Sequence, residues 1–315
     1  MTEGRPLTIS GDLGSGKTTV ANEVAHRLGI RRVSMGDVHR KMAEERGMTA
    51  LQLNLHSERD QEIDKHVDRV QAEMADSGEQ LIMDSRLGWH FFKEAFKIHL
   101  IVDPDVAAQR VLGRPSTQVE SYGSIEDAKR DLHDRSESER QRFITKYNVD
   151  KTRLRNYSLI CDTTDITPQE AAAQIVEIFE SSDRDIEKAS APHLLLNPSR
   201  IYPTEKIQSL RGMWEEEGNL FVERVRDGEE FDPISVGYSN GYFFVIDGHR
   251  RLSAAIRAGQ RIVKAYLCAE FEEQVIGGLS ATEYFESSVH LSMVYDWEAA
   301  HNVTLPLPAH IPQPI

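Results

Sequence analysis

The sequence predicts an α/β fold with a parallel sheet over residues 1–182 and a smaller α+β domain over residues 193–303. In the first range, short apolar runs alternate with helical patterns, which is typical of parallel βαβ units. Residues 183–192 are polar and end at a proline, which indicates an inter-domain linker. The length of 315 residues agrees with two domains, because a domain averages about 150 residues.

The individual elements follow from apolar runs and their spacing. In the first domain, strands are predicted at residues 6–10, 32–34, 80–84, 98–102 and 159–162, and helices at residues 18–28, 38–74 (irregular in the middle) and 168–179. In the second domain, strands are predicted at residues 234–236, 242–246 and 260–267, and a short helix at residues 252–258. Residues 304–315 hold four prolines, so we expect this tail to be extended or disordered.

Composition excludes several classes of protein. The formal charge of -14 opposes a general nucleic-acid-binding role, which needs a cationic surface. Two cysteines, Cys161 and Cys268, lie far apart and provide neither a disulfide framework nor a zinc site. No apolar run approaches 18 residues, and the first six residues are too short and polar for a signal peptide. We therefore expect a soluble cytoplasmic protein that does not act on membranes or nucleic acids.

A glycine-rich motif lies between the first predicted strand and the first predicted helix. Residues 11–18 read GDLGSGKT and fit the pattern G-x-x-x-x-G-K-[ST]. Glycines let successive backbone N–H groups turn inward around a phosphate, and the positive end of the following helix points at the same anion. The alternative is a glycine-rich turn that binds nothing. The predicted ATP-binding residues are Gly11, Gly14, Ser15, Gly16, Lys17, Thr18 and Thr19.

Phosphoryl transfer also needs a metal anchor and a group that holds the acceptor. Lys17 is expected to reach the β- and γ-phosphates, and Thr18 to offer its hydroxyl to Mg²⁺. Asp84 closes an apolar strand, which is a suitable position for a carboxylate that holds Mg²⁺ or its water shell; the alternative is an exposed strand-end carboxylate. Thr18 and Asp84 are therefore the predicted metal ligands. Arg86 follows two residues later and could bind an acceptor anion with both guanidinium arms.

Although the chain is acidic, residues 110–155 are locally basic and hold eleven lysines and arginines. The ordinary interpretation is a solvated helix face whose cations pair with acidic residues one turn away. The other is a helical hairpin that closes over bound phosphates as a lid. For any single arginine the sequence leaves both interpretations open.

Together these motifs resemble the nucleoside monophosphate kinases, and most closely the short, archaeal-type cytidylate kinases. The resemblance covers about the first 180 residues and rests on six segments that occur in the same order: LTISGDLGSGKTTVANEVAHRLG, VSMGDVHRKMA, DSRLGW, AQRVLGR, DRSESERQRFITKYNVD and YSLICDTTDITPQE. It implies the P-loop three-layer parallel sheet with a helical lid, with ATP as phosphate donor and Mg²⁺ as cofactor.

The resemblance also implies roles for single residues. The acceptor nucleotide would be bordered by Gly36, Asp37 and Arg40, and its monophosphate gripped by Arg86, so that the predicted acceptor-binding residues are Asp37, Arg40, Asp84 and Arg86. Residues flanking or closing the lid would be Arg110, Arg114, Arg135, Arg140 and Arg142, with Tyr147 and Asp150 as scaffold behind them. The predicted catalytic residues are Lys17, Arg114, Arg135 and Arg140.

Two departures from the family pattern leave the identity of the acceptor open. Met83 and Asp84 stand where family members carry a small residue and a glutamate. Arg114 is followed by Pro115 and a polar stretch that is longer and less regular than the family pattern.

In the second domain, the segment FFVIDGHRRL leads a buried strand through a tight turn into a helix. Asp247 and Gly248 allow the turn, and His249, Arg250 and Arg251 follow at the helix N-terminus, where N–H groups and cations could converge on a phosphate. With its flanking segments it resembles the ParB/sulfiredoxin-like fold, whose motif handles nucleotide phosphates. The alternative is that Asp247 caps the helix and the arginines are solvated.

Three functions remain in order of preference. The first is an ATP- and Mg²⁺-dependent phosphotransferase that acts on a nucleoside monophosphate, with CMP or dCMP favoured. The second is a specialised kinase for a modified nucleotide or nucleoside in a biosynthetic pathway. The third is a nucleotide-dependent regulatory or binding protein that uses the ParB-like domain. All three take small-molecule nucleotides as partners, and whether the chain forms a homo-oligomer is open.

Overall fold

The computed structural model describes residues 4–48, 61–113, 123–182, 191–210, 212–275 and 277–312. Packing divides the chain into two compact units, Met1–Ser190 and Ala191–Ile315. Most of the predicted linker, residues 183–190, lies outside the described residues. Within the described ranges, no helix combines the length and the apolar character needed to cross a membrane.

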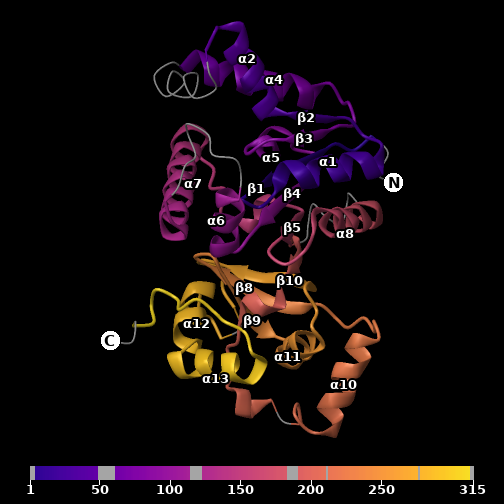
Figure 1. Ribbon diagram of the computed structural model, residues 1–315, viewed down its shortest axis with the longest axis vertical. Coiled ribbons are helices and arrows are strands. Elements are labelled where there is room, and N and C mark those ends of the chain that lie inside the picture. The colour runs from indigo at the N-terminus through magenta and orange to yellow at the C-terminus, as the bar shows by residue number, and fades with distance from the viewer. Residues whose placement is uncertain are drawn as a thin grey trace. The chain divides into compact units, whose positions relative to one another are not determined.

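The sheet of the first unit has strand order β2-β3-β1-β4-β5 (Figure 1). The strands are β1 (Leu7–Gly11), β2 (Arg32–Ser34), β3 (Ile82–Asp84), β4 (Phe96–Ile101) and β5 (Leu159–Asp162). Every neighbouring pair is parallel, which confirms the predicted parallel α/β sheet. Because the strands are parallel, their carboxyl ends meet at one edge, where α/β proteins bind ligands.

Helices α1 (Lys17–Leu28) and α8 (Pro168–Ser181) lie side by side next to this sheet (Figure 1). α1 buries Val20 and Val24, as its helical spacing predicts. α8 begins with a capping box formed by Thr167 and Glu170, and it buries Phe179 against Phe96 of β4, with ring centroids 5.4 Å apart.

The predicted helix over residues 38–74 is two helices, α2 (Met35–Glu45) and α4 (Gln61–Asp76). Residues 49–60 between them lie outside the described residues. Ser34 caps the N-terminus of α2, and its hydroxyl accepts a hydrogen bond from the backbone N–H of Asp37. The short helix α5 (Gly88–Phe91) contacts both α4 and β1. Residues of α2 and α4 line one cavity together with the first residues of α1.

The helical hairpin expected after the fourth strand consists of α6 (Pro104–Leu112) and α7 (Ile125–Tyr147). The two helices pack through an apolar cluster that includes Val111 and Leu132. Residues 114–122 between them, which include the predicted catalytic residue Arg114, lie outside the described residues. α7 ends at Asn148, which has the left-handed φ of 54° that often terminates helices. A short 3₁₀ turn, Leu154–Asn156, leads into β5.

The second unit has a mixed sheet with strand order β6-β10-β8-β9-β7. The strands are β6 (His193–Leu196), β7 (Ile201–Tyr202), β8 (Ile234–Ser239), β9 (Tyr242–Asp247) and β10 (Val263–Glu270). β10 is antiparallel to β6 and parallel to β8, whereas β8 is antiparallel to β9. The helices are α10 (Glu216–Arg226), α11 (His249–Ala258), α12 (Ala281–Ser288) and α13 (Leu291–His301). This is an α+β arrangement, while the ParB/sulfiredoxin-like resemblance stays a prediction.

The proline-rich tail is packed against the second unit over residues 304–312. It has no regular secondary structure, as its prolines predict, but Leu305 and Ile311 are buried. The hydroxyl of Tyr202 donates a hydrogen bond to the carbonyl of Pro306. Burial of these two apolar side chains therefore orders a segment that composition alone leaves extended or disordered.

We predict that Phe179→Ala lowers the stability of the first unit by about 3–5 kcal/mol, because it removes a buried ring and leaves a cavity against Phe96. Chemical denaturation, followed by near-UV circular dichroism, measures this loss. Glu180→Ala, an exposed substitution in the same turn, is the matched control and should change the stability by less than about 0.5 kcal/mol. Equal unfolding midpoints for the two variants would show that the α8 contact is not a main source of stability.

Candidate active site

A cavity of about 610 Å³ lies at the carboxyl edge of the sheet in the first unit. Its walls come from the glycine-rich loop, the first turns of α1 and α2, helix α4, the turn after β3 and the last turns of α7. Residues that the sequence analysis assigned to the site and that line the cavity are Gly11, Gly14, Gly16, Lys17, Thr18, Thr19, Gly36, Arg40, Asp84, Arg86, Arg142 and Tyr147. The structure thus brings most of the predicted donor and acceptor residues around one space.

The glycine-rich loop is tightly curved, and two of its positions require glycine. A Cβ atom on Gly11 would lie 2.8 Å from the carbonyl oxygen of Leu100. Gly14 has a φ of 86°, and a Cβ atom there would lie 2.7 Å from the Cβ of Ala107. The backbone N–H of Ser15 donates to the carbonyl of Asp12 at 3.1 Å, which closes the turn. The loop has the inward curvature that a phosphate cradle needs.

Two residues outside the loop brace it from behind. Thr163, directly after β5, donates its hydroxyl to the carbonyl of Ser15 at 2.9 Å. Arg110 of α6 contacts the carbonyl of Gly14 at 3.5 Å and donates to the carbonyl of Thr163 at 2.7 Å. Arg110, predicted to flank the lid, therefore holds the back of the loop. The hydroxyl of Ser15 is buried and has no hydrogen-bond partner in the described part of the chain.

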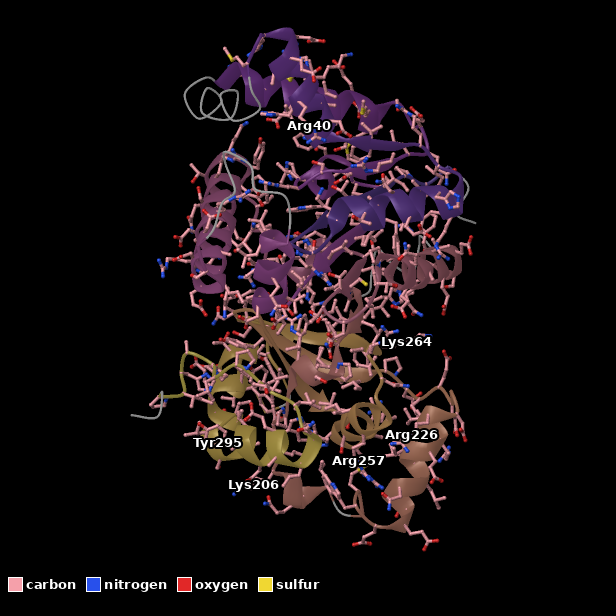
Figure 2. All side chains as sticks on the ribbon, in the orientation of Figure 1. Arg40, Lys206, Arg226, Arg257, Lys264 and Tyr295 are labelled. Carbon is pink, nitrogen blue, oxygen red and sulfur yellow. The ribbon has the colours of Figure 1, made fainter. Side chains whose placement is uncertain are left out.

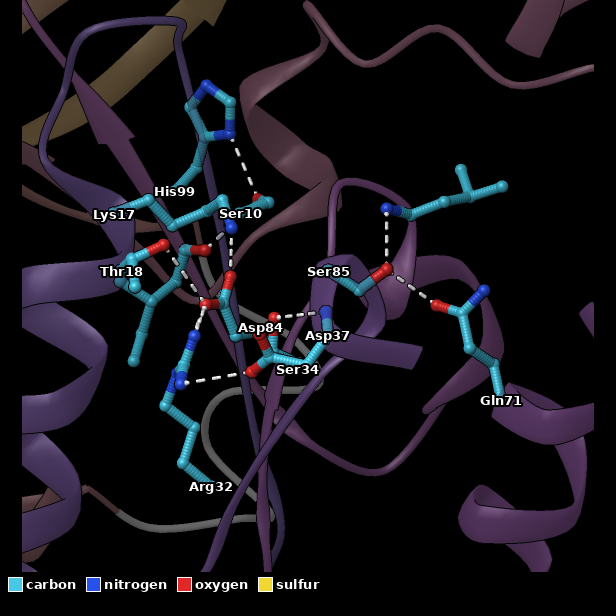
Figure 3. A network of polar contacts seen from close by, with 12 residues as sticks. Ser10, Lys17, Thr18, Arg32, Ser34, Asp37, Gln71, Asp84, Ser85 and His99 are labelled. Atoms are coloured by element: carbon cyan, nitrogen blue, oxygen red, sulfur yellow. Dashed lines mark hydrogen bonds and ion pairs between the residues drawn. The ribbon is translucent and has the colours of Figure 1, made fainter. Parts of the chain in front are cut away.

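The carboxylate of Asp84 is the centre of a network of polar contacts (Figure 3). Lys17 Nζ donates to Asp84 Oδ1, while Thr18 Oγ1 lies 3.4 Å from Oδ2. Arg32, the first residue of β2, donates its Nε–H to Oδ2 at 3.1 Å. The side chain of Asp84 is fully buried, so the alternative of an exposed strand-end carboxylate is wrong. Arg32 was not among the predicted site residues; its only sequence signal is a charge at the start of a short strand.

The ammonium group of Lys17 lies in a partly desolvated position. Burial, together with the positive charges of Arg86 and Arg32, lowers the pKa of Lys17 to about 8. Two further cations thus lie near this ammonium, and the cavity concentrates positive charge. Such a concentration suits a ligand with several negative charges.

The donor set at Thr18 and Asp84 fits Mg²⁺ held jointly with a nucleotide. Both residues offer oxygen atoms, and these lie close together at the start of α1. In the described ranges, no group of three or more histidine, cysteine, aspartate or glutamate side chains could hold a metal alone. Mg²⁺ usually binds one or two protein oxygen ligands and completes its shell with phosphates and water. The residues present therefore match a metal that arrives with a triphosphate.

The acceptor side of the cavity is formed by α2, α4 and the turn after β3. Arg40 lies on α2 (Figure 2), where it pairs with Asp37, which does not itself line the cavity. Ser85 donates its hydroxyl to Gln71 Oε1 at 2.6 Å, and Gln71 is almost fully buried in the cavity wall (Figure 3). Gln71 was not predicted, since a polar residue inside a helical pattern gives no local indication of what it faces.

The arginines of α7 differ in the residues that they contact and in whether they line the cavity. Arg140 binds Asp150 with both guanidinium arms, at 2.9 and 2.6 Å. Burial opposes ionisation of Asp150, but the hydrogen bonds from Arg140 and Thr152 outweigh it and lower its pKa to about 2. Arg135 contacts Asp131 on its own helix at 3.4 Å. Neither Arg135 nor Arg140 lines the cavity, whereas Arg142 does. The catalytic roles predicted for Arg135 and Arg140 stay predictions.

In the second unit, the predicted phosphate-binding residues are engaged with protein partners. Arg251 pairs with Asp247 and donates to the carbonyl of Asp232 at 2.8 Å, and Arg250 pairs with Glu217 at 2.9 Å. His249 is buried, which lowers its pKa to about 4, and its Nε2 accepts the backbone N–H of Thr204 at 3.0 Å. Gly248 has a φ of 108° and turns the chain into α11. The turn is as predicted, but an anion site here stays a prediction.

The lowered pKa of Lys17 makes its chemical reactivity depend on pH. A lysine is nucleophilic only when neutral, so Lys17 should react with amine-directed reagents with a midpoint near pH 8, about two units below an ordinary lysine. Peptide mass spectrometry after brief labelling between pH 6 and 11 measures the midpoint. Bound ATP should suppress the labelling, because its phosphates would cover the ammonium group. A midpoint above pH 10 would contradict the desolvated position.

Comparison with known proteins agrees with this arrangement. A family model described as an AAA domain matches residues 7–141. The chain is 37% identical over 163 residues to the cytidylate kinase of Methanobrevibacter smithii, an alignment that covers 52% of this chain and 91% of that protein. It is 36% identical over 188 residues to the cytidylate kinase of Haloarcula marismortui, covering 59% of this chain and 95% of that protein.

One relative has a different description. An S-adenosylmethionine-dependent nucleotide dehydratase of Lacinutrix mariniflava is 34% identical over 179 residues, which are 56% of this chain and 36% of that protein. All three alignments span little more than half of this chain, and two of them span nearly a whole cytidylate kinase. Through its first half, the chain therefore belongs to the cytidylate kinase family of P-loop phosphotransferases.

Proposed function

We propose that this protein transfers the γ-phosphoryl group of ATP to a nucleoside monophosphate, with CMP or dCMP as the preferred acceptor. The observation that carries the proposal is that one cavity is lined both by the glycine-rich loop with Lys17 and by Arg86 and Arg40 on its other side. A phosphate donor and an anionic acceptor could therefore lie in the same space, as transfer requires. The cytidylate kinases among its relatives support the choice of acceptor.

The donor side would be organised by α1 and its loop. Backbone N–H groups of residues 11–18 and the N-terminus of α1 would surround the β-phosphate. Lys17 would exchange its carboxylate partner Asp84 for the phosphate oxygens of ATP. Thr18 and Asp84 would hold Mg²⁺, which when bound supplies charge neutralisation at the β- and γ-phosphates. Arg32 would then remain on Asp84 and keep its carboxylate in place.

The acceptor side would place the attacking atom. An oxygen of the acceptor's phosphate would form the new bond to the γ-phosphorus while the bond to the β–γ bridging oxygen breaks, giving ADP and a nucleoside diphosphate. No protein base is needed, because the acceptor oxygen is already anionic. Arg86 would orient that phosphate, and Arg142 would face the equatorial oxygens from α7.

A second candidate is a specialised kinase for a modified nucleotide or nucleoside. Met83 and Asp84 depart from the family pattern shortly before the acceptor arginine, and the neighbouring Ser85 fixes the buried amide of Gln71 in the cavity wall. The similar segment within a nucleotide dehydratase from Lacinutrix mariniflava also favours this candidate, because that segment belongs to an enzyme whose substrate is a nucleotide and whose product is a modified one. A screen of CMP, dCMP, UMP, AMP and the corresponding nucleosides with ATP and Mg²⁺ distinguishes the two.

We predict that Lys17→Ala lowers kcat by at least about a hundredfold, because the variant loses the cation that compensates the transferring phosphoryl group. A coupled assay of ADP formation with CMP as acceptor measures the effect. Lys206→Ala, which removes an exposed lysine of the second unit, is the matched control and should retain the activity of the native protein. Unchanged ADP formation by Lys17→Ala would remove Lys17 from the mechanism.

Arg86→Gln should distinguish the acceptor side of the cavity from the donor side. Its loss of a charged hydrogen-bond donor is expected to raise the KM for CMP by about ten- to a hundredfold while leaving the KM for ATP within about twofold. Initial rates at varied concentrations of each substrate test this. If the KM for ATP rises and that for CMP does not, the two sides of the cavity have been assigned in the wrong order.

A further inference from the structure

Arg86, which we propose binds the acceptor, is paired with a carboxylate of helix α7. Arg86 Nη1 donates to Glu139 Oε2 at 2.5 Å, which joins the turn after β3 to the middle of α7. The two residues are 53 positions apart in the chain. The Arg86 side chain is half exposed, whereas that of Glu139 is only 10% exposed. The contact therefore lies at the edge of the cavity, with the carboxylate on its protein side.

Glu139 is fixed from its other side by Lys151. Lys151 Nζ donates to Glu139 Oε1 at 2.8 Å and to Ser136 Oγ at 3.1 Å. Burial opposes ionisation of Glu139, but the charges of Arg86 and Lys151 outweigh it, so that its pKa is lowered. An ionised carboxylate is thus held at a defined place, with one oxygen directed to the guanidinium that an acceptor phosphate would need.

The ion pairs of α7 lie either within the helix or between it and another element. Asp131 pairs with an arginine four residues away on the same helix, and such contacts contribute little. Glu139 reaches a residue of the cavity wall on another element, as Lys146 does with Asp68 of α4. Three residues later, Arg142 lines the same cavity, and residues three apart share a helix face. A movement of Glu139 together with this part of α7 would therefore also move Arg142.

We propose that Glu139 is a positioning residue that occupies Arg86 while the acceptor site is empty, and that the acceptor's phosphate displaces it. This inference rests on the proposed function. The phosphate and the carboxylate compete for one guanidinium. In the native protein the acceptor must first break the ion pair, and the free energy that this costs reduces its apparent affinity. Release of Glu139 frees α7 from the turn after β3 and lets Arg142 move, which couples acceptor binding to the lid.

Glu139→Gln tests the competition with little change in side-chain volume. Isothermal titration calorimetry with CMP should show about three- to tenfold tighter binding to the variant than to the native protein, because a neutral amide competes less for Arg86. Cytidine, which lacks the phosphate, should bind both proteins equally. Asp134→Asn makes the same chemical change at an exposed position of α7 and should bind CMP as the native protein does.

A double variant excludes a simpler cause of tighter binding. In Glu139→Gln, Lys151 loses its carboxylate partner and could itself attract the phosphate. Glu139→Gln/Lys151→Met removes that charge, so a gain in CMP affinity that persists is due to the release of Arg86. A gain that disappears in the double variant would overturn the proposed competition.

Hydrogen exchange of the native protein provides a readout that does not depend on any variant folding. CMP should change the exchange of amides at residues 136–142, and cytidine should not. If CMP binds the native protein without changing this segment, or binds Glu139→Gln no more tightly, the role of Glu139 is wrong while the proposed function stands. If no nucleoside monophosphate binds the native protein, both are overturned.

Discussion

The mouth of the cavity in the first unit depends on one buried carboxylate, that of Asp84. A carboxylate that has lost its water must be paired and hydrogen-bonded, since otherwise its burial would cost several kcal/mol. Lys17, Thr18 and Arg32 meet this requirement from two different elements, the start of α1 and the start of β2. The pairing thus fixes the mouth of the cavity, and it holds the cation of the glycine-rich loop in place before any nucleotide is present.

The same exchange of partners is expected on both sides of the cavity. Lys17 is paired with Asp84 and Arg86 with Glu139, so neither cation is left without a counter-charge in this structure. Phosphates would replace these carboxylates as partners, and the charge of each cation would stay compensated throughout. Burial, followed by the positive charges of Arg86 and Arg32, lowers the pKa of Lys17, and the pairing of each cation with a carboxylate offsets this repulsion. The free energy of nucleotide binding is then the difference between the energies of the new ion pairs and of those they replace, and not the sum over the new ion pairs alone.

Local patterns predicted the fold of the first unit and the glycine-rich loop that lines one side of its cavity. Short apolar runs identified β1 to β5, and the GDLGSGKT motif placed Lys17 and Thr18, because strand, loop and helix are adjacent in the chain. Arg32, Gln71 and Glu139 could not be found in this way, since their partners Asp84, Ser85 and Arg86 are 14 to 53 residues distant. A single sequence contains no record of such contacts.

The two strand-turn-helix motifs of the chain differ in the partners that their cations have. Both turns use a glycine with positive φ before a helix, and both place cations beside it. In the first unit the partner of Lys17 is Asp84, a residue of another strand, and the pair lies in the wall of a cavity. In the second unit Arg251 pairs with Asp247 only four residues away and also donates to the backbone carbonyls of Asp232 and Pro233, so an anion there would compete with fixed backbone acceptors. Two similar strand-turn-helix motifs therefore have different surroundings, because tertiary structure sets the partners of their cations.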